Sequence, residues 1–429
     1  MGKRQIPDPP NFKKYGVPFY SVAWIPQHVV KSRQIETADE SSDSDHSTSP
    51  ATEAEKEPAT VAGNYLLFAG GGGAGHSGIP NALVIAHFDV ASNSLSDQPV
   101  CKLGTDSELP YRMALNSNGD GLICAMETPM VCRWFDWDQN KSSEIHKLSL
   151  KLSEKVLSQL EDVGQQLALA FNNDGTALAA GGEDGNLRVF KWPSMEIILN
   201  ETNAHSSLKD LHFSSDGKLL ASLGSGGPCK VWDVSSSMVL SSLSNENSMS
   251  GLNTTLEATI NSAPKETATK AGLGVTAIKA RETFSSCRFS QTNDETLILY
   301  IAAMTDKGGS ILTWNTQTWE RMASKHIIRD PISAFNVSAD GNGTPSGDIV
   351  VVNSTNMQIH TMIKKAHLGI VTALAFSPDS RAVASVSMDS SARVTIIEEK
   401  KTNGLSLWIA LFIILLAVAA YFLRQEIEK

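Results

Sequence analysis

The sequence has few of the features that mark catalytic or metal-binding proteins. Its five cysteines are scattered, and no two form a Cys-x-x-Cys pair, so neither a zinc site nor a disulfide framework is indicated. It has no His-Glu-x-x-His motif and no recognisable Ser/His/Asp arrangement. The formal net charge of −10 argues against nucleic-acid binding, which needs clustered Lys and Arg. We therefore expect no nucleic acid, no small-molecule substrate and no covalent catalysis.

The first residues also lack an apolar run, so no secretory signal peptide is predicted. The long uncharged run lies near the other end, where Leu405 to Leu423 are nineteen residues without a charge. As a helix they span about 28 Å, which matches the hydrocarbon core of a bilayer. Trp408 and Tyr421 lie near its two ends, as interfacial aromatic residues do. We predict a transmembrane helix over 405–423, a lumenal tail over 424–429 and a cytosolic N-terminal part.

A glycine cluster lies between two apolar, strand-like runs, 65–68 and 82–88, and this pattern indicates a long hairpin loop. Glycine has no Cβ, so the loop can bring its backbone close to an ion or to another protein. Ile79, Pro80 and Asn81 follow the glycines. Because Pro80 fixes one φ angle and favours an extended Ile79, we expect a stiff approach that offers the Asn81 side chain outward.

Nucleotide binding at this loop is disfavoured, although residues 73–78 formally match the dinucleotide fingerprint G-x-G-x-x-G. That motif needs a helix directly after it to hold the pyrophosphate, and no helical pattern follows Pro80. No Gly-Lys-Ser/Thr sequence follows either, which excludes a P-loop. A plain flexible hairpin stays open as the simpler alternative.

The remaining chain repeats itself. Phe171-Asn172-Asn173-Asp174-Gly175 recurs 42 residues later as Phe213-Ser214-Ser215-Asp216-Gly217, and Phe190 and Trp232 have the same offset. Weaker copies begin near residues 114, 289, 335 and 376. A period of 42 with Asp-Gly turns between short strands is typical of WD-repeat blades, each a four-stranded sheet. Six copies and the glycine-loop hairpin predict an all-β, seven-bladed propeller over 15–398, closed by a strand over 15–25 against the last blade.

Some segments depart from this pattern. We expect a flexible N-terminus over 1–14, a disordered loop over 36–63 and a surface insertion over 245–281, because these stretches are polar and low in aromatic residues. Near Thr344 the expected second strand is replaced by Gly- and Pro-containing sequence, so that blade is predicted to be incomplete or differently built. His205 and His367 each precede a repeat and are interpreted as parts of buried polar networks rather than as ligands.

Two sequences of the loop, Gly70-Gly71-Gly72-Gly73 and Gly78-Ile79-Pro80-Asn81, carry a family resemblance when they occur with a propeller and a terminal span. Together they resemble the Sec-twelve-type exchange factors of the endoplasmic reticulum, which start COPII coat assembly. The whole chain is similar to the plant members of that family. The segments 109–114, 162–171 and 364–369 also resemble that group.

The resemblance implies a guanine-nucleotide exchange factor that releases GDP from the COPII-initiating small GTPase at the endoplasmic-reticulum membrane and so drives ER-to-Golgi vesicle formation. It implies Asn81 as the contact with the GTPase switch region, positioned by Ile79 and Pro80. It also implies a potassium ion held by backbone carbonyls of Gly70, Gly71, Gly72, Gly73, Gly75 and Gly78. An exchange factor needs only to bind the open form of the GTPase better, so the lack of a catalytic triad is no objection.

Two other function classes stay open. A plant relative helps phosphate transporters leave the endoplasmic reticulum and has this fold without the glycine loop. The intact residues 70–81 argue against that role, whereas the altered blade near Thr344 leaves it open. The second alternative is a membrane-anchored WD-repeat scaffold without exchange activity, because fold alone does not determine function.

Overall fold

The computed structural model describes residues 7–31, 64–75, 78–127, 130–138, 148–244, 282–291, 296–337, 341–344 and 347–398, with Leu415 and Val418. The predicted segments 36–63 and 245–281 lie outside the described residues. The chain divides into two units, 1–396 and 397–429. Leu415 and Val418 of the second unit are helical and exposed, and the rest of the predicted span lies outside the described residues. Among the described residues, no helix has the length and apolar character needed to cross a membrane.

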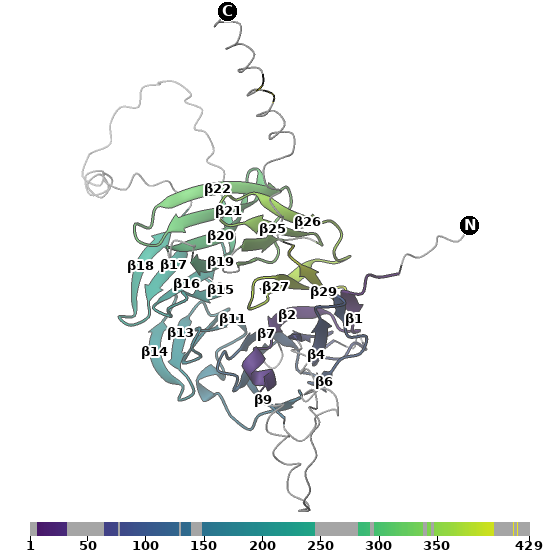
Figure 1. The fold of residues 1–429 in the computed structure, drawn as a ribbon. Coiled ribbons are helices and arrows are strands. Elements are labelled where there is room, and N and C mark those ends of the chain that lie inside the picture. The colour runs from purple at the N-terminus through teal and green to yellow at the C-terminus, as the bar shows by residue number, and fades with distance from the viewer. Residues whose placement is uncertain are drawn as a thin grey trace, which may run out of the picture. The chain divides into compact units, whose positions relative to one another are not determined.

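The first unit is an all-β propeller, in which sheets stand around a central axis with one strand of each sheet innermost (Figure 1). Its described strands form six four-stranded sheets and one five-stranded sheet. The five-stranded sheet contains β2 (Phe19–Trp24), β3 (Asn64–Gly70), β4 (Ala82–Asp89), β5 (Ser94–Leu95) and β6 (Cys101–Gly104). The next sheet contains β7 (Pro110–Leu115), β8 (Gly121–Met126), β9 (Cys132–Trp137) and β10 (Leu150–Leu152).

A short 3-10 helix, η1 (Ser158–Leu160), leads into the sheets built from the strongest repeats. The first of these contains β11 (Gln166–Phe171), β12 (Ala177–Gly182), β13 (Leu187–Lys191) and β14 (Glu196–Glu201). The second contains β15 (Leu208–Phe213), β16 (Leu219–Gly224), β17 (Cys229–Asp233) and β18 (Met238–Leu243). The sheet after them contains β19 (Thr283–Gln291), β20 (Leu297–Thr305), β21 (Gly308–Asn315) and β22 (Arg321–Ile328).

The sixth sheet contains β23 (Asn336–Val337), β24 (Gly341–Thr344), β25 (Ile349–Asn353) and β26 (Ile359–Ile363). The last sheet contains β27 (Val371–Phe376), β28 (Ala382–Ser387), β29 (Ser391–Ile396) and, from the N-terminus, β1 (Phe12–Lys14). The blade near Thr344 therefore has a second strand, β24, which pairs with both β23 and β25. The sequence did not reveal this strand, because its pairing uses backbone groups alone and needs no apolar pattern.

The repeats that were read from the sequence produce the turns of the fold. Asp174 and Asp216 accept hydrogen bonds from the backbone N–H of Thr176 and Lys218, at 3.0 and 3.1 Å, which closes the turn between the first two strands of each sheet. The second strands of these sheets are largely buried, as in the small-residue sequence of β12, because both of their faces are covered by neighbouring sheets.

The ring is closed differently from the prediction. The strand that completes the last sheet is β1, which pairs with β29 through Phe12 and Arg393, and the segment 15–25 instead supplies β2, the innermost strand of the glycine-loop sheet. Residues 12–14 of the predicted flexible N-terminus are thus part of the propeller. Phe12 is buried, and its ring centroid lies 6.0 Å from that of His367. Closure covers the edge of β29, which would otherwise expose unpaired backbone groups.

The two repeat histidines occupy buried polar networks, as predicted. His205 contacts the hydroxyl of Ser222 at 2.8 Å, and the indole N–H of Trp232 donates to the same hydroxyl. His367 lies between the hydroxyls of Ser391 and Ser385, at 2.6 and 2.7 Å. Burial lowers the pKa of both imidazoles to about 4, so both rings are neutral at pH 7.

The closing strand gives a test by substitution. We expect Phe12→Ala to lower the free energy of unfolding by about 3 kcal/mol, because it removes a buried aromatic side chain from the seam that closes the ring. Lys14→Ala, an exposed position on the same strand, should change it by less than about 0.5 kcal/mol. Urea unfolding followed by circular dichroism measures both, and equal effects of the two changes would contradict the assignment of β1.

Candidate functional site

The glycine loop connects β3 to β4, and its two ends are fixed by the sheet. Gly70 pairs with Ala82 across the hairpin and with Phe19 on β2, so it belongs to the sheet rather than to the loop. At Gly71 the backbone passes so close to Asn81 that a Cβ atom would overlap the Oδ1 atom of that side chain. Gly73 has φ of +79°, a conformation that other residues rarely adopt. Close approach at one position and a positive φ at the other therefore require glycine.

Asn81 does not point outward, contrary to the prediction. It is 3% exposed, and its Oδ1 accepts a hydrogen bond from the backbone N–H of Gly73 at 3.0 Å. Its Nδ2 donates to the carbonyl of Asp106 at 3.0 Å. A buried amide must satisfy its donors and acceptors, and the nearest backbone groups belong to the loop and to the segment after β6. Asn81 therefore fastens the loop to that segment.

The exposed part of the loop lies next to Asn81. Ile79 is 39% exposed and Pro80 is exposed, and they follow the exposed Gly78. An exposed branched apolar side chain beside a proline that restricts the backbone is a suitable contact for another protein. In the structure Asn81 thus holds the loop in position while Ile79 and Pro80 are exposed, and the contact of these residues with a partner stays a prediction.

Side chains of the loop's own sheet and of the neighbouring sheet lie near the base of the loop. A carboxylate oxygen of Glu127 lies 3.4 Å from the position that a Cβ of Gly73 would occupy. Burial raises the pKa of Tyr20, and the carboxylate of Glu127 and the phenol of Tyr111 raise it further. The rings of Tyr20 and Tyr111 are 5.5 Å apart, and the guanidinium of Arg112 lies over Tyr111 at 4.6 Å.

Sequence reasoning missed Glu127, Tyr20 and Arg112 as members of this region. Tyr111 and Arg112 belong to the segment 109–114, which resembles the family but to which the sequence analysis assigns no role. That resemblance is the one sequence feature that could have indicated their place in this region. Glu127 directly follows a strand of a different sheet, β8, and no local pattern connects it to a glycine so much earlier in the chain.

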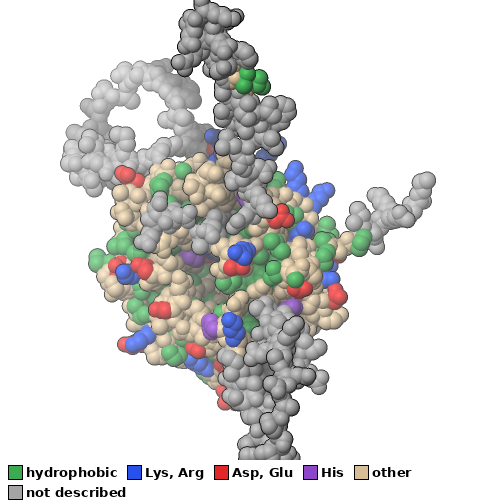
Figure 2. Space-filling model, in the orientation of Figure 1, with side chains coloured by type: hydrophobic (Ala, Val, Ile, Leu, Met, Phe, Trp, Pro, Cys, Tyr) green, Lys and Arg blue, Asp and Glu red, His purple; other side chains and the backbone are tan. Residues whose placement is uncertain are grey.

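Six innermost strands have a β-bulge near their start, at the centre of the ring. The register of the first strand pair shifts near the start of β2, β7, β11, β15, β19 and β27. A bulge of this kind redirects a side chain. Tyr20, Tyr111 and Lys209 are the extra residues in three of these strands. Figure 2 shows hydrophobic side chains near the middle of the ring and charged side chains scattered around its rim.

A Ser/His/Asp group that the sequence did not reveal lies in the last sheet. His367 contacts Ser385 and Ser391, and Ser391 donates to Asp389. Both serines are fully buried and His367 is 3% exposed, so no substrate can reach their hydroxyls. The group is a structural network. Among the described residues there is also no cluster of three or more His, Cys, Asp or Glu that could hold a metal ion.

Comparisons with known proteins agree with this geometry. The family model described as "WD domain, G-beta repeat" matches residues 161–191 and 357–395. The chain is 46% identical to SEC12-like protein 2 of Arabidopsis thaliana over 396 residues, which cover 91% of this chain and 89% of that protein. It is 26% identical over 360 residues to SEC12-like protein 1 of the same plant, covering 82% and 80% of the two chains. It is 24% identical over 414 residues to the guanine nucleotide-exchange factor SEC12 of Rattus norvegicus, covering 84% and 92%.

The buried position of Asn81 leads to a prediction. We expect Asn81→Ala to lower the free energy of unfolding by about 1–3 kcal/mol, because the Gly73 N–H and the Asp106 carbonyl lose their partner. Amide hydrogen exchange should accelerate at Gly73 and at Thr105, whose N–H donates to the Asn81 carbonyl. Unchanged exchange at both amides would contradict the fastening role. Asn200→Ala, at an exposed asparagine of the outermost strand β14, is the matched control.

Proposed function

Because the chain belongs to the SEC12-like family of WD-repeat proteins, we propose that it is a guanine-nucleotide exchange factor. It releases GDP from the small GTPase that initiates the COPII coat at the endoplasmic-reticulum membrane. Support comes from the similarity to the rat exchange factor along most of both chains, and from the glycine loop with its exposed Ile79 and Pro80. The proposal also includes the number of blades and the membrane anchor. Each of the seven sheets is one blade, and residues 405–423 anchor the propeller to the membrane on its cytosolic side.

The observation that carries the proposal is a set of exposed apolar side chains at the same end of the ring as the loop. Leu368, Ile370 and Met388 are 83%, 56% and 49% exposed. Met388 lies in the connection between the second and third strands of its sheet, as the glycine loop does, and Leu368 and Ile370 precede an innermost strand. All these connections lie at one end of the ring, because the strands alternate in direction. The two sheets are neighbours, since Thr372 donates to the carbonyl of Phe19.

An apolar patch of this kind suits a protein partner better than a small molecule. Nucleotide release requires only that the partner's open form bind more tightly than its GDP-bound form, so a rigid docking surface is sufficient. The loop supplies the rigid part because Asn81 fixes Gly73 and the segment that contains Asp106. In this proposal Ile79 and Pro80 contact the GTPase switch region, and Asn81 positions them.

The exchange assay tests this assignment. Purified residues 1–396, the unit that contains all the described strands, should accelerate the release of a fluorescent GDP analogue from the COPII-initiating GTPase. Ile79→Ser should lower this acceleration at least about tenfold, which corresponds to about 1.4 kcal/mol of lost contact. Ile197→Ser, an exposed position on the outermost strand β14, should leave it unchanged.

Equal activity of the Ile79 variant and the wild-type protein would remove the loop from the interface. No acceleration by folded wild-type protein would favour the second candidate, a non-catalytic endoplasmic-reticulum factor that assists the exit of cargo such as phosphate transporters. The higher identity to the SEC12-like proteins than to the rat exchange factor is the observation that favours this candidate.

The proposed potassium ion fits the residues present at the loop. The oxygen atoms that the structure places at Gly73 are a carboxylate oxygen of Glu127 and the backbone carbonyl of Gly73, which also accepts a hydrogen bond from Nδ2 of Asn81 at 3.4 Å. Hard cations prefer oxygen ligands, and a single carboxylate matches a single positive charge. We propose that Gly71, Gly72 and Gly73 hold the ion together with Glu127, while Gly75 and Gly78 extend the loop around it. When bound, the ion would neutralise Glu127 and stiffen the loop.

Removal of potassium gives a readout that does not depend on exchange activity. Amide hydrogen exchange over 71–81 should be slower in potassium chloride than in N-methylglucamine chloride at the same ionic strength, by about threefold or more. Glu127→Gln should remove this difference because it removes the compensating charge. The amides of β12, in a different sheet, are the internal control. Identical exchange of the loop in both salts would contradict the potassium site.

A further inference from the structure

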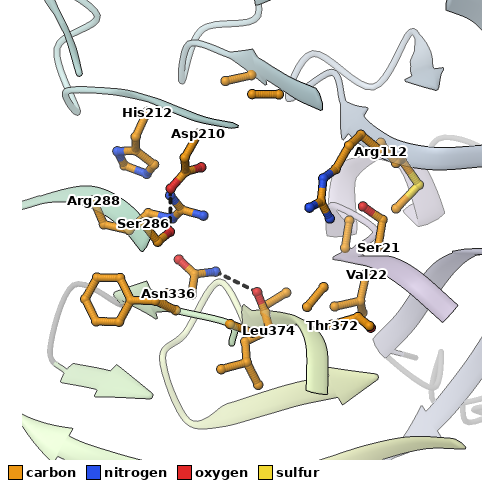
Figure 3. A pocket seen from close by; sticks show the side chains of 18 of the residues that line it. Ser21, Val22, Arg112, Asp210, His212, Ser286, Arg288, Asn336, Thr372 and Leu374 are labelled. Carbon is orange, nitrogen blue, oxygen red and sulfur yellow. Dashed lines mark hydrogen bonds and ion pairs between the residues drawn. The ribbon is translucent and has the colours of Figure 1, made fainter. Parts of the chain in front are cut away.

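The centre of the ring contains a cavity of about 500 Å³ that the proposed exchange function does not use (Figure 3). It is lined by residues of the innermost strands, including Arg112 of β7, Lys209 and Asp210 of β15, and Arg288 of β19. Cavities of about 300–1,000 Å³ are typical of small-molecule sites. The charges on its wall indicate what kind of molecule it suits.

The lining has an excess of positive charge, although the whole chain has a formal net charge of −10. Three cations, Arg112, Lys209 and Arg288, face a single carboxylate, that of Asp210. This carboxylate is already engaged, because it accepts hydrogen bonds from the backbone N–H of Cys287 at 2.9 Å, from the guanidinium of Arg288 at 2.6 Å, and from the hydroxyl of Ser286. Asp210 therefore compensates Arg288 and leaves the other two cations uncompensated within the lining.

The arginines are held in place but keep unused donors. Arg112 donates from Nε to the carbonyl of Leu167 at 3.1 Å and from Nη1 to the carbonyl of Tyr20 at 3.3 Å, which links three neighbouring sheets. Arg288 uses Nη1 for both of its hydrogen bonds. In each case Nη2 has no hydrogen-bond partner in the described part of the chain. Figure 3 shows the two guanidinium groups on opposite walls of the cavity.

Three further polar groups of the wall are occupied. The hydroxyl of Thr372 donates to the carbonyl of Phe19, that of Ser285 to the carbonyl of Ala302, and the amide of Asn336 to the carbonyl of Leu374. Lys209 is exposed and forms no ion pair with any described residue. The lining therefore offers cationic donors, namely the two guanidinium groups and the ammonium of Lys209, and proteins use such groups to bind phosphate.

We propose that the central cavity binds a small molecule that carries several phosphate groups, with Arg112, Lys209 and Arg288 as its contacts. The cations on opposite walls suit a ligand whose charges are spread around a compact scaffold. The same chemistry occurs on soluble inositol phosphates and on phosphoinositide headgroups. The experiment below distinguishes these two sources, and its result is independent of nucleotide exchange.

The test uses the full chain in detergent solution at near-physiological ionic strength, with inositol hexakisphosphate as the probe in isothermal titration calorimetry. We expect saturable binding of one molecule per chain. Lys209→Gln should weaken it about tenfold, because one charge-assisted contact is lost. Arg112→Lys should weaken it similarly, because a lysine ammonium cannot reproduce the planar arrangement of N–H donors in a guanidinium group. Lys325→Gln, an exposed lysine on the outermost strand β22, is the matched control and should bind as the wild type does.

No saturable binding by the wild type would overturn the proposal, and so would an equal loss in the Lys209 and Lys325 variants, because that would indicate binding to general surface charge. Thermal unfolding of each variant excludes misfolding as the cause of a loss. Nanodiscs that contain phosphatidylinositol 4-phosphate separate the two sources. Binding that inositol hexakisphosphate displaces would assign the cavity to a lipid headgroup, and binding of the soluble probe alone would assign it to a soluble ligand.

Discussion

The pairing of β1 with β29 is the constraint on which the rest of the propeller depends. It brings residues 12–14 into the same sheet as residues 391–396, across nearly the whole length of the first unit. A blade cannot bury both faces of its sheet alone, so each sheet needs a neighbour on either side. Only closure gives the first and the last sheet this neighbour. It also places the β2 sheet, which carries the glycine loop, beside the β27 sheet, whose connections carry the exposed residues Leu368 and Met388.

Within the closed ring, polar side chains of the innermost strands carry contacts from one sheet to the next. Thr372 reaches β2, Arg112 reaches β2 and β11, and Asp210 and His212 reach β19. These bonds satisfy backbone groups of the innermost strands, each of which has a partner strand on one edge only. Burial and the nearby charge of Arg288 lower the pKa of His212 to about 3, so this imidazole is neutral and its Nδ1 can accept the bond from the backbone N–H of Phe289. The same arrangement that holds the sheets together places cations around the cavity.

Features that depend on residues close together in the chain, such as turns, could be predicted from the sequence. Contacts between segments far apart in the chain could not. Asp174-Gly175 and Asp216-Gly217 define their turns through local hydrogen bonds, so the period of 42 correctly indicated these turns and the WD-repeat propeller. The strand β1 has only three residues, and its partner lies at the far end of the first unit, so its own pattern resembles a loose terminus. The role of Asn81 depends on Asp106, and the cavity depends on residues from separate sheets. No local pattern reports such contacts.

The position of Asn81 explains how a glycine-rich loop can serve as a rigid contact. A loop of flexible residues would lose considerable conformational entropy on binding a partner, at roughly 1–2 kcal/mol for each residue that becomes ordered. The three side-chain hydrogen bonds of Asn81 and the close approach of Gly71 fix part of the loop before any partner arrives. Preorganisation of this kind lowers the entropic cost of association. Because Asn81 is buried and the proposed contact residues Ile79 and Pro80 are exposed, the proposal separates stability from recognition, and substitutions at these adjacent positions should affect the two properties separately.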